Sequence, residues 1–177
     1  MAVQIGARPD CGFDDPIGML KDCHRRIERF LNILCVVADR APRRNLTEEE
    51  KSAVQSAMSY FQRGGKRHTA DEEESLFPRL RAALASGGCE EVNGLEDDHR
   101  IANELHQMVD TLYSAWIEVG RLSLEDGHRL QSATHRLKAL YEAHIRIEED
   151  IVFPRAAEML GSQTIAAIGI ELRARRQ

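Results

Sequence analysis

Two histidine–glutamate pairs at helical spacing are the residues of this chain best suited to hold a metal. His68 is followed four residues later by Glu72, and His144 is followed four residues later by Glu148. Residues four apart lie about 40° apart on one face of an α-helix, so each pair can offer one nitrogen and one carboxylate to the same ion. The spacing therefore predicts two metal-binding helix faces.

An internal repeat relates the two halves of the chain. The segment EEESLFPR recurs as EEDIVFPR after 76 residues, and the histidine four residues before each segment recurs with it. At an offset of 75 residues, DCHR around His24 matches DDHR around His99. Each half thus has a histidine, a gap of about 44 residues, an HxxxE pair and a Phe-Pro kink. Two such halves predict a bundle with pseudo-twofold symmetry.

The combined donor set suits a centre of two metal ions. Four imidazole nitrogens and up to four carboxylate oxygens can hold two ions bridged by the two glutamates, with positions left for water, hydroxide or a small ligand. We predict two iron ions with an oxo, hydroxo or water bridge, although zinc or manganese would accept the same donors. The predicted metal ligands are His24, His68, Glu72, His99, His144 and Glu148.

Other carboxylates lie next to these pairs and need separate interpretation. Asp71 lies three residues after His68, but its counterpart in the repeat is Ile147, so the recurring glutamate is the better candidate for a ligand. Glu73 and Glu149 also recur in the repeat. Because an adjacent helical residue points about 100° away, we expect these two to leave the histidine face and to cap or pair at the surface.

Three further residues are candidates for contacts just outside the ligands. His106 lies two turns after His99, where we expect either a packed histidine or one that supports a ligand. Tyr141 lies one turn before His144 and could form a hydrogen bond near the centre or simply pack in the core. Asn103 follows His99 by four residues and completes this group.

Start and stop signals predict the helices that position these residues. A first helix begins after Asp14 or Asp15 and ends before Pro42, and Thr47 with Glu50 forms a capping box for a second helix. The second helix has a weak point at Gly64–Gly65, a predicted kink at Pro78 and a stop at Gly87–Gly88. A third helix is predicted from near residues 93–95 to Gly120, and a fourth from near Ser123 to Leu160, with its stop at Gly161. A short helix that Ser162 caps is predicted over 162–175.

No segment has the period of a β-strand, so the predicted fold class is all-α. Four long amphipathic helices with short loops predict an antiparallel up-down four-helix bundle, followed by the short C-terminal helix. A length of 177 residues fits one domain over 1–177, with its core at about 12–160.

Composition argues against nucleic acid and membrane as partners. The net charge is −5, and the one basic run, Arg173 to Arg176, is expected to place cations at the end of the last helix. No segment approaches the roughly 18 apolar residues that a membrane span needs, and the first residues lack the apolar region of a secretion signal. The four cysteines form no CxxC motif, which predicts reduced thiols in a cytoplasmic protein.

At its candidate ligands the chain resembles the hemerythrin-like HHE cation-binding domains, especially the small bacterial members. The resemblance covers about residues 12–160. It rests on GFDDP and CHRRIERFL around His24, HTADEEESLFP from His68, DDHR at His99 and HIRIEEDIVFP from His144. It implies that the six predicted ligands bind a di-iron centre in an up-down bundle. Family roles include oxygen binding, oxygen or iron sensing, iron–sulfur cluster repair and the handling of nitric oxide.

The chain also departs from the specialised branches of that family. Oxygen-carrying hemerythrins have a second histidine where Asn103 stands, and they end with HxxxxD where this chain has HxxxE. Iron–sulfur repair members have an extra histidine, near the position of Asn45, and a cysteine-containing N-terminal domain. Iron-sensing F-box members have a glutamate at the position of Thr69. The departures argue against a plain oxygen carrier.

We therefore expect a non-catalytic di-iron protein that binds or senses a small gaseous or oxidant ligand such as oxygen or nitric oxide. One alternative is a di-iron enzyme that handles peroxide or nitric oxide or repairs iron–sulfur clusters. Another is a storage or interaction bundle whose metal is structural. The sequence leaves the oligomeric state and the identity of the ligand open.

Overall fold

Helices make up all the regular structure of the described residues. The computed structural model describes residues 11–41, 44–84 and 90–177. Its elements in chain order are α1 (Pro16–Ala38), α2 (Glu48–Tyr60), the π-helical turn η1 (Phe61–Gly65), α3 (Lys66–Ala70), the π turn η2 (Asp71–Leu76), α4 (Phe77–Ala83), α5 (Glu90–Val119), α6 (Leu124–Ile147), the π turn η3 (Glu148–Val152), α7 (Phe153–Met159) and α8 (Ser162–Ala174).

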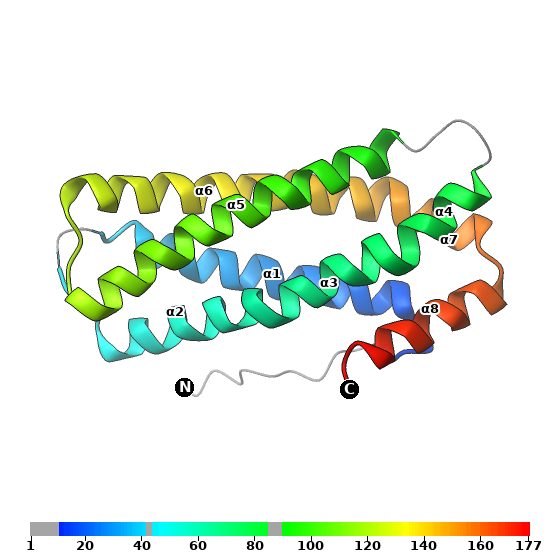
Figure 1. Ribbon diagram of the computed structural model, residues 1–177, viewed down its shortest axis with the longest axis horizontal. Helices are drawn as coiled ribbons and strands as arrows, with labels where there is room; N and C mark the ends of the chain where they lie inside the picture. The colour runs from blue at the N-terminus through cyan, green and yellow to red at the C-terminus, as the bar shows by residue number, and fades with distance from the viewer. Residues whose placement is uncertain (1–10, 42–43, 85–89) are drawn as a thin grey trace.

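These elements form four long rods and one short helix (Figure 1). The run α2 to α4 forms one rod, and α6 with η3 and α7 forms another. Helix α1 packs against α2 and α6, and α5 packs against the same two helices from the other side. Successive rods run in opposite directions, and α8 lies against α1 and η2 near one end. The predicted all-α antiparallel up-down bundle with a short C-terminal helix is confirmed.

Three helices begin with a side-chain cap at the place where the sequence predicted their start. The Asp15 carboxylate accepts a hydrogen bond from the Gly18 N–H at the start of α1. The capping box of Thr47 and Glu50 is formed in both directions, and the Ser123 hydroxyl accepts from Asp126 at the start of α6. Because these caps join residues three apart, local sequence was sufficient to predict them.

Two boundaries differ from the prediction. Helix α5 begins at Glu90, several residues before 93–95, and its first-turn acidic residues lie where the helix dipole favours negative charge. Gly161 is the N-cap of α8, so Ser162 is the first helical residue and not the cap, and the helix ends at Ala174. The predicted signals at Pro42 and at Gly87–Gly88 lie outside the described residues.

The π turns stand where the sequence predicted weak points. The turn η1 ends at Gly64–Gly65, and η2 and η3 are each followed by a Phe-Pro pair. Pro78 and Pro154 have no N–H to donate to the residue four before them, so the regular α-helical ladder is interrupted there. The predicted kink at Pro78 thus takes the form of a π turn just before the proline, and that turn contains a candidate ligand, Glu72.

A polar layer divides the hydrophobic core into two clusters. One contains Ile27, Leu31 and Trp116, and the other contains Leu76 and Phe153. The buried histidines and glutamates lie at heights between these clusters; on α1, for example, the candidate ligand lies between Leu20 of one cluster and Ile27 of the other. Within the described ranges, every helix is too short or too polar to span a lipid bilayer.

Candidate metal centre

The six predicted ligands meet inside the bundle, and none is more than 9% exposed. They come from all four rods and form two groups of four that share both glutamates. We call the first group the His24 position and the second the His99 position. In each group the candidate donor atoms all lie within 4.8 Å of one another. The His24 position comprises His24, His68, Glu72 and Glu148, and the His99 position comprises His99, His144, Glu72 and Glu148.

Glu72 places one carboxylate oxygen in each position. Its Oε1 lies 3.2 Å from Nε2 of His68 and 3.9 Å from Nε2 of His24. Its Oε2 lies 3.4 Å from Nε2 of His99. The carboxylate therefore stands between two groups of nitrogens, as a bridging ligand does.

Glu148 divides its oxygens between the positions in the same way. Its Oε2 lies 3.0 Å from Nε2 of His24, and its Oε1 lies 3.4 Å from Nε2 of His144. The two glutamates are related by the sequence repeat, so the pseudo-twofold symmetry predicted from the repeat extends to the arrangement of the donor atoms.

Most of these buried donor atoms have no hydrogen-bond partner in the described part of the chain. They include both oxygens of Glu72, both oxygens of Glu148, and Nε2 of His24 and His144. Unpartnered buried polar atoms are rare because each costs about 1–3 kcal/mol. Oxygen and nitrogen lone pairs that converge without hydrogen bonds are the environment a metal cation requires, so this donor set fits a metal.

Comparison with known proteins agrees with this geometry. Residues 15–163 match the family described as the hemerythrin HHE cation-binding domain. The chain belongs to this family. It is also 28% identical over 165 residues to an uncharacterized protein of Haemophilus influenzae, an alignment that covers 93% of this chain and 92% of that relative. Membership of the HHE family and the cluster of histidines and glutamates together indicate a cation site.

Two carboxylates that were predicted to lie at the surface contact candidate ligands of this HHE site. Oε1 of Glu149 lies 2.7 Å from Nδ1 of His24, and Oε1 of Glu73 lies 2.8 Å from Nδ1 of His99. The expectation that both would only cap or pair at the surface was wrong. A residue turned about 100° from a ligand faces the neighbouring helix in a four-helix bundle, and here each reaches a ligand on that helix.

Asp98 has a similar role that the sequence analysis missed. Its Oδ2 lies 3.3 Å from Nδ1 of His144. Such an outer carboxylate accepts the imidazole N–H, which fixes the tautomer and leaves Nε2 free to bind a metal. The repeat gave a signal for Glu73 and Glu149, which recur at matching positions, but none for Asp98, whose counterpart is Cys23.

Charges within the centre shift the pKa values of its histidines. Burial lowers the pKa of His24, but the nearby carboxylates of Glu148 and Glu72 outweigh it and raise the pKa to about 10. Against the same burial, Glu72 raises the pKa of His99 to about 9. Burial dominates at His68 and lowers its pKa to about 4. Without metal, the imidazoles of His24 and His99 are therefore protonated at pH 7 and lie beside the carboxylates.

The residues predicted just outside the ligands lie beside one another. The Tyr141 hydroxyl is 3.2 Å from Nε2 of His106, whose ring is 4.5 Å from that of Phe61. Burial lowers the pKa of His106 to about 4, so this imidazole is neutral at pH 7. The Tyr141 ring is 6.2 Å from the His144 ring. Neither residue enters either group of candidate ligands.

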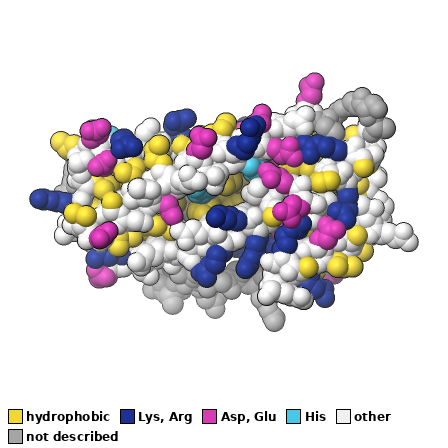
Figure 2. Space-filling model, viewed as in Figure 1, with side chains coloured by type: hydrophobic (Ala, Val, Ile, Leu, Met, Phe, Trp, Pro, Cys, Tyr) yellow, Lys and Arg dark blue, Asp and Glu magenta, His cyan; other side chains and the backbone are white. Residues whose placement is uncertain are grey.

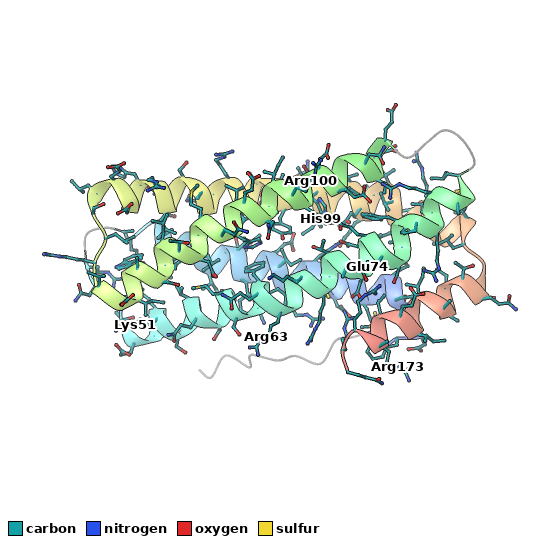
Figure 3. The ribbon with its side chains drawn as sticks, viewed as in Figure 1. Lys51, Arg63, Glu74, His99, Arg100 and Arg173 are labelled. Atoms are coloured by element: carbon teal, nitrogen blue, oxygen red, sulfur yellow. The ribbon has the colours of Figure 1, made fainter. Side chains whose placement is uncertain are left out.

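A cavity of about 450 Å³ opens beside His99. It lies between α5 and the rod formed by α2 and α3, and its lining includes Phe61, Ala102, Asn103 and Tyr141 as well as His99. Figure 2 shows histidine and hydrophobic atoms in a hollow of this face, and Figure 3 shows His99 in the space between α5 and α3. Asn103 is exposed and lines the same cavity.

Proposed function

We propose that this chain holds two iron ions, one in each position, and binds or senses a small gaseous or oxidant ligand such as oxygen or nitric oxide. One observation supports this proposal above the others: each of the two glutamates has one oxygen in each position. Bound iron would supply redox chemistry and an open coordination position. The protein would supply the four imidazoles, the two bridging carboxylates and a largely apolar surrounding.

The donor count leaves room for a further ligand. Four nitrogens and four oxygens shared between two ions give about four donors per ion, below the roughly six that an octahedral ion takes. The cavity beside α5 gives a small molecule access to the His99 position. Phe153 stacks on His24 and Phe77 stacks on His99, with ring centroids 5.4 Å and 6.4 Å apart, so the cavity and not the aromatic rings distinguishes the two positions. We therefore propose that the ligand approaches from the His99 side.

Metal analysis tests the first part of this proposal. Protein purified from iron-replete cells should contain close to two irons per chain. One tightly held zinc, with no uptake of iron by the metal-free protein, would refute it.

The reaction with oxygen tests the second part. Asn103 replaces the additional histidine of oxygen carriers, so we expect the reduced protein to be oxidised by oxygen and not to hold oxygen reversibly. Stopped-flow spectroscopy of the reduced protein mixed with oxygen follows this process. Uptake of oxygen that is released intact under vacuum over repeated cycles would instead support a carrier.

An enzymatic role is a second candidate, because the cavity also has room for a small substrate such as peroxide. Its volume is about 450 Å³, and one water molecule in the liquid takes about 30 Å³. Turnover of peroxide or nitric oxide under reducing conditions would distinguish an enzyme from a sensor. We place either activity in the cytoplasm, in keeping with the free thiols of Cys11, Cys23 and Cys35.

A further inference from the structure

Three of the four ligand histidines have an outer carboxylate on Nδ1, and the fourth does not. The pairs are His24 with Glu149, His99 with Glu73, and His144 with Asp98. His68 is 3% exposed, and its Nδ1 is buried without a hydrogen-bond partner among the described residues. Among the four histidines, His68 is therefore the one whose outer contacts depart from the pseudo-twofold symmetry.

The sequence repeat explains why His68 differs. The repeat pairs His144 with His68, and it pairs Asp98, the outer carboxylate of His144, with Cys23. Cys23 is buried on α1, immediately before the ligand of that helix. A thiol is a weak hydrogen-bonding group and its side chain is shorter than that of aspartate. The residue that the repeat assigns to this place is thus a cysteine, which has no carboxylate to accept the imidazole N–H of His68.

The thiol is not itself an additional ligand. Both groups of potential metal donors consist of histidines and glutamates, and Cys23 belongs to neither. Its neighbour on α1 already points into the centre, and successive helical residues point about 100° apart. The role considered for Cys23 is therefore indirect: it leaves His68 without an outer carboxylate.

An outer carboxylate changes how strongly a histidine binds metal. It fixes the tautomer and the ring orientation and raises the basicity of the bound nitrogen, and its removal typically costs about 10- to 100-fold in metal affinity. The His99 position has two histidines with such partners, whereas the His24 position has one. The two positions share the same glutamates, so the outer partners of their histidines distinguish them.

We infer that the two metal positions are unequal: the His99 position fills first and holds its ion more tightly, because Cys23 stands where the His24 position would need a carboxylate to orient His68. This inference rests on the proposed two-metal centre. The proposed access route agrees with this order of filling, because His99 and Glu73 line the cavity beside α5, while His24 and His68 are absent from its described lining.

Anaerobic calorimetric titration of the metal-free protein with ferrous iron measures the difference. We expect two binding steps whose dissociation constants differ by about 10- to 100-fold. The order of filling comes from NMR of the histidine rings during titration with zinc. At one equivalent, signals of His99 and His144 should shift further than those of His24 and His68, which feel this ion only through the shared glutamates.

Exchanging the two residues that the repeat pairs gives a sharper test. Cys23→Asp should strengthen the second step by about tenfold or more and bring the two steps together. Asp98→Cys should weaken the first step by a similar factor and also bring the steps together. The double exchange should reverse the order of filling. Cys35→Ser, on the same helix but in contact with Thr134, is the matched control and should leave both steps unchanged.

The outcomes separate this inference from the proposed function. Two ions that bind with equal affinity to the unmodified protein, or an unchanged ratio of the two steps in Asp98→Cys, would overturn the inference and leave the two-metal centre intact. Binding of one ion or none to the unmodified protein would refute the two-metal centre itself. If Cys23→Asp does not fold, the Asp98→Cys variant still decides, because Asp98 is partly exposed and tolerates a smaller side chain.

Discussion

At the scale of single residues, the two shared glutamates have a different task from the carboxylates around them. Glu72 and Glu148 are completely buried, and each faces nitrogens of both positions. Glu73 and Glu149 are partly exposed and contact the opposite nitrogen of a ligand. In each repeat, the first glutamate is thus a candidate bridge between the two positions, and the second glutamate is the partner of a histidine on a neighbouring helix.

Replacing a shared glutamate should weaken metal binding at both positions. For Glu72→Ala or Glu148→Ala we expect a loss greater than the roughly 10- to 100-fold that removal of an outer partner such as Glu73 costs. Elemental analysis and titration with ferrous iron measure both effects. Glu104→Ala, at an exposed site on α5, is the control and should bind normally. Equal losses from Glu72→Ala and Glu73→Ala would show that Glu72 does not bridge.

Metal binding should release protons and strengthen as the pH rises. In the metal-free chain the pKa of His24 is about 10 and that of His99 about 9, so both imidazoles are protonated at pH 7. A metal requires them neutral, so binding should release about two protons near neutral pH. Calorimetry in buffers of different ionisation enthalpy measures this number. An affinity that stays constant between pH 6 and 9 would contradict the assignment.

The same shifts make the stability of the metal-free protein depend on pH. Both folded-state pKa values lie above the unfolded value of about 6.5, so protonation stabilises the metal-free fold fully below pH 6.5. This contribution is lost as the pH rises through 9 and 10. Thermal unfolding of metal-free protein should therefore occur at lower temperature at pH 9 than at pH 7.

At the scale of elements, helix α8 stabilises the segment that contains Glu72. Asp71, which precedes this candidate ligand, is fully buried and pairs with Arg175 at 3.0 Å and with Arg176 at 2.6 Å. At Gly169 a Cβ atom would lie 1.9 Å from the Phe13 carbonyl oxygen, so α8 also packs closely on the segment before α1. The basic C-terminal run thus ends a helix, as expected, and has a specific buried partner in the bundle.

Removing the two arginines should destabilise the protein. In Arg175→Ala/Arg176→Ala the Asp71 carboxylate would stay buried without a cation, which costs about 3–5 kcal/mol in a dry interior and less here because both arginines are partly exposed. We expect a loss of about 2–3 kcal/mol in denaturant unfolding. Adding Asp71→Asn should recover part of it, and Arg136→Ala on exposed α6 surface should have little effect. No recovery with Asp71→Asn would show that the arginines act elsewhere.

At the scale of the whole molecule, a layer of polar residues separates two hydrophobic clusters. The residues of that layer lose their hydration on folding, and most of their inward-facing atoms find no hydrogen-bond partner among the residues that the structure describes. Such burial is unfavourable unless another interaction compensates for it. A metal that binds only the folded chain would supply this interaction, so metal content and stability should be linked.

Removal of the metal should lower the melting temperature. A free metal concentration of 100 times the dissociation constant stabilises the folded state by about 2.7 kcal/mol per site. For a chain of this length, 1 kcal/mol shifts the midpoint by about 2–4 °C, so we expect a fall of about 5 °C or more after chelation. Differential scanning calorimetry measures it. Glu72→Ala should be insensitive to the chelator, and an unchanged midpoint in metal-stripped native protein would argue against this link.

The sequence by itself determined the parts of this protein that depend on neighbours along one helix. The pairing of His68 with Glu72, the capping box at Thr47 and the interruption before Pro78 all follow from contacts or missing hydrogen bonds within about four residues. The internal repeat then related the two halves of the chain, and with them the four histidines and two glutamates of the candidate centre.

Only the tertiary structure decided which residues support those ligands. Glu149 and His24 are 125 residues apart, and Asp98 and His144 are 46 apart. Contacts between different helices depend on the rotation and the relative height of the rods, which hydrophobic periodicity leaves undetermined. For this reason the sequence placed Glu149 at the surface and did not show that Cys23 replaces the carboxylate that His68 lacks.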